Sequence, residues 1–120
     1  MYNERLARIA GVSLPFVAQT TTRMSWFVYV VRLSSELDRD QVMTELAKRG
    51  IPSRPYFSPI HLQPFYRELH SYREGEFPVT EKVAKAVLAL PFYGGMEEEQ
   101  IDRVCEGLAE TLTQRRVRRG

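Results

Sequence analysis

The sequence has little cysteine, little lysine and no long apolar run. Cys105 is the single cysteine among 120 residues, so an internal disulfide framework is excluded. No apolar run approaches the roughly 20 residues that a membrane-spanning helix needs, and Met1–Leu6 contains no apolar signal core. We therefore expect a cytoplasmic protein with no membrane partner. Cys105 falls on the apolar side of an expected C-terminal helix, which predicts a buried side chain without a chemical role.

Several catalytic and binding patterns are missing as well. The chain shows no carboxylate pair, serine–histidine–acid arrangement, glycine-rich phosphate loop or metal-ligand cluster, which leaves hydrolase, kinase and zinc chemistry without support. The net charge is only +2, although four arginines gather near the C-terminus: Arg115, Arg116, Arg118 and Arg119. A nucleic-acid module would need a wider basic face with aromatic residues between the cations. We expect no nucleic-acid partner, because cations after a helix complement its negative end.

What the chain does contain is typical of one globular domain. Hydrophobic residues make up 43% and charged residues 27%, and the length allows a modest core. The expected organisation is a connecting helix and linker over residues 1–22, an α/β core over 23–114 and a basic tail over 115–120. A strand, helix, strand order at the start of this core predicts a two-layer α/β sandwich.

The helix expected over residues 39–49 has the most complete signals. Asp38 is placed as its N-cap, and Gln41 stands three residues later, where a capping box needs it. Leu37 and Val42 can form a hydrophobic staple across that cap, and Gly50 is placed to end the helix.

The remaining elements follow from hydrophobic periodicity. Apolar side chains on both alternating faces predict a central strand over Met24–Leu33. Helical spacing predicts further elements: a short helix over residues 3–10, a connector over 12–22, a helix starting at Pro64, a helix over 79–88 leading into a short strand at 88–90, and a final helix from about Glu97. The final helix places Ile101, Val104, Leu108 and Leu112 toward the core.

The most informative segment runs over residues 50–66, Gly-Ile-Pro-Ser-Arg-Pro-Tyr-Phe-Ser-Pro-Ile-His-Leu-Gln-Pro-Phe-Tyr. Its prolines lack backbone donors and push the preceding residues toward extended geometry, so it makes a poor central strand. We interpret it as a rigid wall that presents four candidate substrate-binding residues: Arg54, Tyr56, His61 and Tyr66.

Each candidate has a structural alternative. Arg54 stands between two prolines and can offer its guanidinium to a carboxylate or phosphate, or form a salt bridge with a nearby glutamate. His61 can donate to a substrate hydroxyl or phosphate, or bond a loop carbonyl. Tyr56 and Tyr66 can stack on a sugar or nucleotide ring, or pack in the core, where Trp26 is expected.

Several motifs in a fixed order resemble the C-terminal small domain of the DegT/DnrJ/EryC1/StrS aminotransferases, which are pyridoxal-phosphate-dependent sugar aminotransferases of fold type I. The resemblance extends from about Met1 to Leu112. It rests on the segment over residues 50–66 together with four further motifs: Ser-Trp-Phe-Val-Tyr-Val-Val at 25–31, Phe-Pro-Val-Thr-Glu at 77–81, Ala-Leu-Pro-Phe-Tyr at 89–93 and Glu-Glu-Gln-Ile-Asp-Arg-Val at 98–104.

The resemblance implies a small, mainly antiparallel sheet of three strands covered by helices. It also implies that the full-length protein is a homodimer that transfers an amino group, commonly from glutamate, to a keto sugar linked to a nucleotide. In this family a larger N-terminal domain carries the lysine that binds pyridoxal phosphate. We therefore expect this chain to be a fragment that binds no cofactor and is inactive alone.

Three lysines bear on that expectation. Lys48, Lys82 and Lys85 all fall on predicted helices, in settings unlike the family's cofactor-lysine motif, and are expected to face solvent. Two alternatives stay open: a non-catalytic interaction or regulatory module with the same small-domain fold, and a domain of a related sugar dehydratase that uses the same cofactor.

Overall fold

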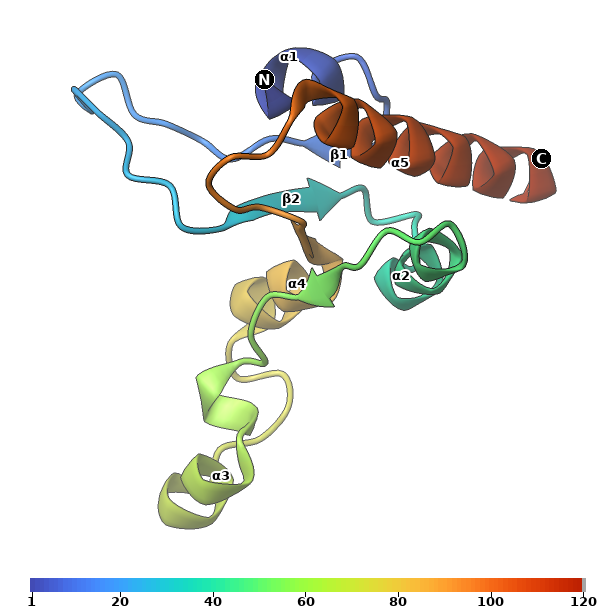
Figure 1. Cartoon of the computed structure of the whole chain (residues 1–120). Coiled ribbons are helices and arrows are strands. Elements are labelled where there is room, and N and C mark those ends of the chain that lie inside the picture. The colour runs from blue at the N-terminus through green and yellow to red at the C-terminus, as the bar shows by residue number, and fades with distance from the viewer. Residues whose placement is uncertain (120) are drawn as a thin grey trace.

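The computed structural model describes residues 1–119, which form a four-stranded sheet and five α-helices (Figure 1). In chain order the elements are α1 (Tyr2–Leu6), β1 (Val12–Ser13), β2 (Tyr29–Leu33), α2 (Arg39–Lys48), β3 (Arg54–Pro55), a 3₁₀ turn η1 (Ile60–Leu62), α3 (Pro64–His70), α4 (Pro78–Ala86), β4 (Val87–Leu90) and α5 (Glu98–Arg119). None of the helices described is both long and apolar enough to cross a membrane.

The sheet has the strand order β1-β2-β4-β3, and every neighbouring pair is antiparallel. The expected fold class is confirmed, but the expected number of three strands is wrong. The additional strand is β1, whose Val12 and Ser13 pair with Leu33 and Arg32. Two residues are too few to produce a hydrophobic alternation, so this strand leaves no periodic signal in the sequence.

One face of the sheet carries the core. Tyr29, Val31 and Leu33 alternate along β2, and Leu88 and Leu90 lie beside them on β4, all of them buried. The other members of this apolar cluster are Ile51, which follows α2, and nine residues of the helices α1, α2 and α5: Tyr2, Leu6, Val42, Leu46, Ile101, Val104, Cys105, Leu108 and Leu112. Cys105 is therefore a buried packing residue, as expected.

The helix over residues 39–49 is confirmed as α2. The Oδ1 atom of Asp38 accepts a hydrogen bond of 3.1 Å from the backbone N–H of Gln41, so the N-cap is formed. The opposite end stops at Gly50, whose φ of +74° is a conformation that glycine adopts without steric cost.

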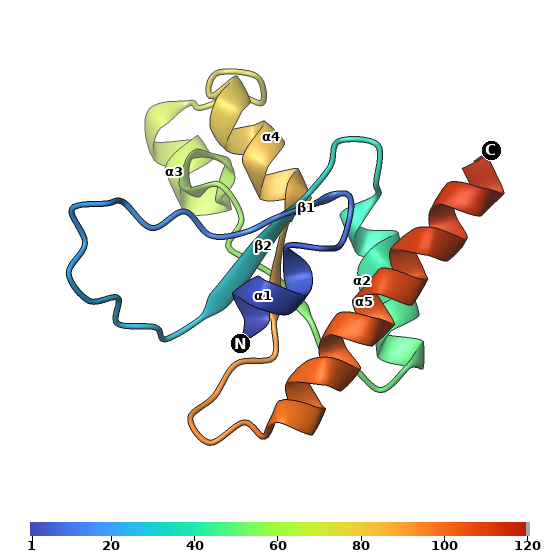
Figure 2. The same cartoon turned by 90° about the horizontal axis from the view of Figure 1, so that it is seen from above.

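The central strand is shorter than expected from the sequence, which predicted a start at Met24. It begins at Tyr29, which pairs with Leu90, the last residue of β4. The residue that follows β4 is Pro91, which has no N–H to donate, so the ladder stops and residues 14–28 form a loop. Figure 2 shows this loop reaching outward from the sheet.

Two helix boundaries also differ from the sequence-based expectation. The first helix ends at Leu6 instead of residue 10, because the chain turns there to bring β1 beside β2. At the other end, the segment expected as a basic tail over residues 115–120 is helical as far as Arg119, and Gly120 lies outside the described residues. Arg115 on this part of α5 contacts Gln41 and Glu45 of α2. Figure 2 shows α5 lying along α2.

The segment between β3 and β4 projects from the sheet as an arm. It consists of η1, α3, a loop and α4, and Figure 1 shows α3 at the end farthest from the sheet. Several of its apolar side chains are exposed, among them Ile60, Phe65, Leu69 and Val79. Within the described residues, no element of the sheet or of the core helices covers α3.

Candidate functional site

Arg54 lies on the sheet face opposite the core. It pairs with Ala89 of β4, and Ala89 in turn pairs with Val30 of β2, so the three residues form one row across the sheet. Proline follows Arg54, which is compatible with β3 because this strand is at the sheet edge. Arg54 is exposed and takes part in none of the ion pairs formed within residues 1–119. The alternative of a local salt bridge is thus not realised, and the guanidinium is free to meet an anion.

Tyr56 lies two residues further along, beside the same row. It is half-buried and lines a hollow of about 180 Å³ whose walls are almost entirely apolar. The other walls come from Val30 on β2 and from the loop that precedes it, including Trp26 and Phe27. The hollow can accept a flat or apolar group, and Arg54 stands in the same sheet row as Val30, which lines the hollow, on the far side of Ala89. An apolar hollow and a nearby cation on one sheet face suit a ring that carries an anionic substituent.

His61 is placed differently from the other candidates. Its side chain is buried in η1, with Nε2 3.3 Å from Oε1 of Glu81 on α4. The rings of Phe77 and Tyr72 flank the imidazole at centroid distances of 4.7 and 6.2 Å. The partner of His61 is therefore a helix carboxylate and not a loop carbonyl, and the residue joins the two halves of the arm.

Glu81 is the residue of this site that the sequence analysis missed. It is buried, and its carboxylate oxygens accept the backbone N–H of Gly75 at 2.8 and 3.0 Å. A signal was present in the sequence, because Glu81 stands at helical spacing from the apolar residues Phe77, Ala84 and Leu88, in steps of four, three and four. A carboxylate on an otherwise apolar stripe calls for a buried polar partner.

Tyr66 is not brought together with the other candidates. It lies on α3 near the end of the arm, is 39% exposed and packs edge-on against Phe65 at 5.3 Å. The structure thus places Arg54 on β3 with Tyr56 directly after this strand, buries His61 inside the arm and leaves Tyr66 on α3.

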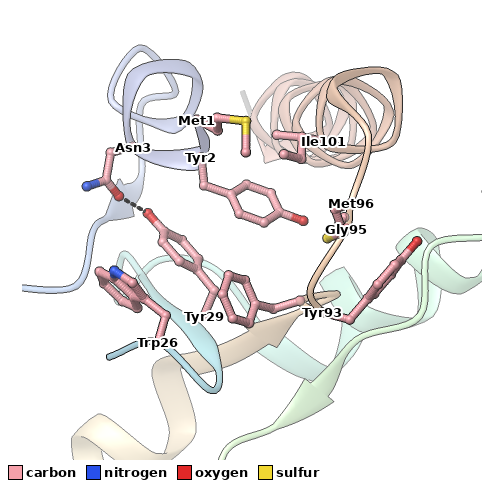
Figure 3. A pocket seen from close by; sticks show the side chains of 10 residues that line it. Met1, Tyr2, Asn3, Trp26, Tyr29, Tyr93, Gly95, Met96 and Ile101 are labelled. Carbon is pink, nitrogen blue, oxygen red and sulfur yellow. Dashed lines mark hydrogen bonds between the residues drawn. The ribbon is translucent and has the colours of Figure 1, made fainter. Parts of the chain in front are cut away.

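A second hollow, of about 350 Å³, opens between α1, β2 and the loop before α5 (Figure 3). Tyr2, Tyr29 and Trp26 line it, with Trp26 half-buried against the core. Both tyrosine hydroxyls are already used, because Tyr2 donates to the carbonyl of Pro91 and Tyr29 to the side-chain oxygen of Asn3. Burial raises the pKa of Tyr29 to about 12, so this phenol keeps its proton at neutral pH. The hollow has aromatic walls but little free polar chemistry.

The three lysines face solvent, as expected. Lys48 forms an ion pair with Glu45 at 2.9 Å and Lys85 one with Glu74 at 3.7 Å, while Lys82 is exposed on α4. Residues 1–119 also contain no cluster of three side chains able to hold a metal ion.

Comparisons with known proteins agree with this fold. The profile of the DegT/DnrJ/EryC1/StrS aminotransferase family matches residues 1–109. The GDP-perosamine synthase of Caulobacter vibrioides is 38% identical over 114 residues, which cover 92% of this chain and 30% of the relative.

Solved structures give the same result. DesV of S. venezuelae superposes with a TM-score of 0.79 at 34% identity, covering 91% of this chain and 28% of DesV. A putative PLP-dependent aminotransferase of Bacillus cereus superposes with a TM-score of 0.72 at 28% identity, covering 89% of this chain and 28% of that protein. The chain therefore spans less than a third of the length of these relatives, and it belongs to the DegT/DnrJ/EryC1/StrS aminotransferase family.

Proposed function

We propose that this chain is the C-terminal small domain of a pyridoxal-phosphate-dependent sugar aminotransferase and that it forms one side of the substrate cleft. The observation that carries the proposal is the family match over residues 1–109 combined with coverage of only 30% of a related sugar-nucleotide enzyme. The remaining length of such an enzyme is enough for a larger domain and its cofactor site.

The placement of the lysines supports this division of labour. A lysine that forms a Schiff base needs a site from which water is excluded. A lysine side chain that stands in solvent and is paired with a glutamate does not have such a site. Lys48 and Lys85 are both held in such exposed pairs. We therefore assign the binding of pyridoxal phosphate, which supplies the electron sink for amino transfer, to the part of the longer protein outside this chain.

The sheet face that carries Arg54 and Tyr56 is the part of this chain best suited to the substrate. The guanidinium of Arg54 takes part in none of the ion pairs within residues 1–119, and the apolar hollow that Tyr56 lines can accept a ring. We propose that Arg54 binds the diphosphate of a nucleotide-linked keto sugar or the carboxylate of an amino donor such as glutamate. Tyr56 would stack against the ring, and His61 would add a hydrogen bond from the arm.

The reading frame upstream of the Met1 codon tests the proposal. We expect it to encode a large domain with a cofactor lysine, and the longer protein to form a homodimer and to aminate a nucleotide-linked keto sugar at the expense of glutamate. The 120-residue chain, purified and supplied with pyridoxal phosphate, should be inactive. A histidine in place of the cofactor lysine would indicate a sugar dehydratase instead. A native start at Met1 would overturn the enzyme proposal in favour of a non-catalytic module.

A further inference from the structure

The buried carboxylate of Glu81 has two partners of different kinds. Both of its oxygens accept the N–H of Gly75, and Oε1 lies 3.3 Å from Nε2 of His61. Glu81 is 7% exposed and His61 is 8% exposed. The hydrogen bond from Gly75 and, second, the nearby imidazole hold the pKa of Glu81 below its usual value, although burial acts in the opposite direction. The carboxylate is therefore ionised at neutral pH.

The two nitrogens of the His61 imidazole differ in their surroundings: Nε2 is buried beside Glu81, whereas Nδ1 has no hydrogen-bond partner among the described residues. Nε2 is fully buried and makes no hydrogen bond of standard geometry within residues 1–119, but Oε1 of the Glu81 carboxylate lies 3.3 Å away as its ion-pair partner. The flanking rings of Phe77 and Tyr72 are apolar surfaces for the imidazole and limit its rotation. Nδ1 is bonded to no described group and is not sealed inside, so it is the ring atom that can meet a ligand.

The other charges near this pair lie farther out. Lys85 on α4 attracts the Glu81 carboxylate, but it is exposed and forms an ion pair with Glu74 of the preceding loop. Water screens such exposed charges strongly. The group that sets the charge facing His61 is accordingly Glu81.

We infer that Glu81 is a positioning residue for His61: its carboxylate accepts a hydrogen bond donated by Nε2–H, which keeps the proton on Nε2 and leaves Nδ1 as the atom presented to the substrate. In a neutral imidazole the hydrogen bond made by one nitrogen fixes the tautomer, so Nδ1 becomes an acceptor for a sugar hydroxyl. In a protonated imidazole, Nδ1 becomes a donor to a phosphate or carboxylate oxygen. The identity of the ligand rests on the proposed function, whereas the pairing does not.

Nitrogen-detected NMR of the 120-residue chain tests the pairing without any activity. With His61 neutral, we expect its proton on Nε2 and a bare Nδ1, and we expect a protected Nε2–H resonance that exposed His70 does not show. A proton on Nδ1 with a bare Nε2 in wild-type protein would overturn the inference.

Charge removal gives a second readout. In Glu81→Gln we expect exchange of the Nε2–H proton to accelerate about tenfold or more, because a hydrogen bond to a charged acceptor is replaced by a neutral one. Glu74→Gln, which removes an exposed carboxylate from the same loop region, is the matched control and should leave this exchange unchanged. Equal exchange in wild type and in Glu81→Gln would contradict the inference even if both proteins are fully folded.

Kinetics of the longer aminotransferase test whether Glu81 affects substrate binding through His61. We expect Glu81→Gln to raise the KM for the nucleotide sugar several-fold, and to add little once His61 is alanine, because Glu81 acts through His61. Fully additive effects of the two substitutions would overturn the inference. If the NMR of the 120-residue chain confirms the pairing but the longer protein has no aminotransferase activity, the proposed function is refuted and the pairing stands.

Discussion

Tyr2 of α1 stacks on Tyr29 of β2, with ring centroids 4.8 Å apart and planes 27° apart. The same Tyr2 donates a hydrogen bond of 2.7 Å from its hydroxyl to the carbonyl oxygen of Pro91, a residue 89 positions away. One side chain therefore joins the first helix to the central strand, where Figure 3 shows the rings of Tyr2 and Tyr29 together, and to the residue that follows β4. This contact holds the end of β2 at which the preceding loop enters the sheet.

Truncating Tyr2 should destabilise the fold strongly. We expect Tyr2→Ala to lower the free energy of unfolding by about 3–5 kcal/mol, because a buried aromatic ring leaves a cavity. Tyr2→Phe should cost only about 1 kcal/mol, since the ring stays and one hydrogen bond is lost. Urea denaturation followed by circular dichroism measures both. Tyr93→Ala is the control, because Tyr93 lines the same hollow but is 53% exposed. An equal cost for Tyr2 and Tyr93 would show that α1 is not part of the cooperative core.

Gly107 on α5 should reveal a tight contact with Ile51. A Cβ atom at Gly107 would lie 2.2 Å from Cδ1 of Ile51, so alanine cannot fit unless that buried side chain moves. Alanine also raises helix propensity by about 1 kcal/mol. We expect Gly107→Ala to be neutral or destabilising in the wild type, and stabilising by about 0.5–1 kcal/mol in an Ile51→Val background, which lacks Cδ1. A double-mutant cycle by thermal or urea unfolding measures this coupling. Identical effects of Gly107→Ala in both backgrounds would contradict the contact.

Cys105 should make stability sensitive to alkaline pH. Burial, opposed in part by the nearby Arg5, raises the pKa of this thiol to about 11. The folded protein thus favours the neutral thiol, so the contribution is complete below the unfolded pKa of about 9 and is lost as the pH rises toward 11. We expect the wild type to lose on the order of 1–3 kcal/mol more than Cys105→Ala over this range. Urea unfolding at pH 7, 9 and 10.5 measures the difference, and parallel pH profiles would show that the thiol is not desolvated.

Arg54 should matter for binding but not for folding. Because its guanidinium is exposed and unpaired within the described residues, Arg54→Ala should change the free energy of unfolding by less than about 0.5 kcal/mol. In the longer aminotransferase, the same substitution should raise the KM of the anionic substrate about 10- to 100-fold, the cost of a charged hydrogen bond. Arg67→Ala, an exposed arginine on α3, is the control. Unchanged kcat/KM in Arg54→Ala would remove Arg54 from the proposed site.

Local signals in the sequence were sufficient for several elements. Asp38 and Gly50 mark the ends of α2, and the apolar spacing from Ile101 to Leu112 marks the buried face of α5. The prolines around Arg54 excluded a central strand, and β3 is indeed a two-residue edge strand. Caps, glycine conformation and proline geometry act within a few residues, so their signals can be read without knowledge of the fold.

Other features depend on partners that are distant in the sequence. Strand β2 starts at Tyr29 because Pro91, which follows β4, cannot donate a further hydrogen bond to the ladder. Strand β1 forms because Val12 and Ser13 pair with Leu33 and Arg32 of β2. Both assignments failed from sequence because strand pairing is a tertiary property, in which hydrogen bonds join segments with no local relation.

The family, the capped helix α2 and the proline-rich segment that carries Arg54, Tyr56 and His61 could be recognised in the sequence, because motif order and local backbone preferences depend on neighbouring residues. The different surroundings of Arg54 and His61 follow from contacts between distant segments. Cross-strand register put Arg54 on the open sheet face beside Val30 and Ala89. Packing of η1 against α4 buried His61 on Glu81, twenty residues away, because a buried imidazole needs a polar partner and the fold supplies this carboxylate.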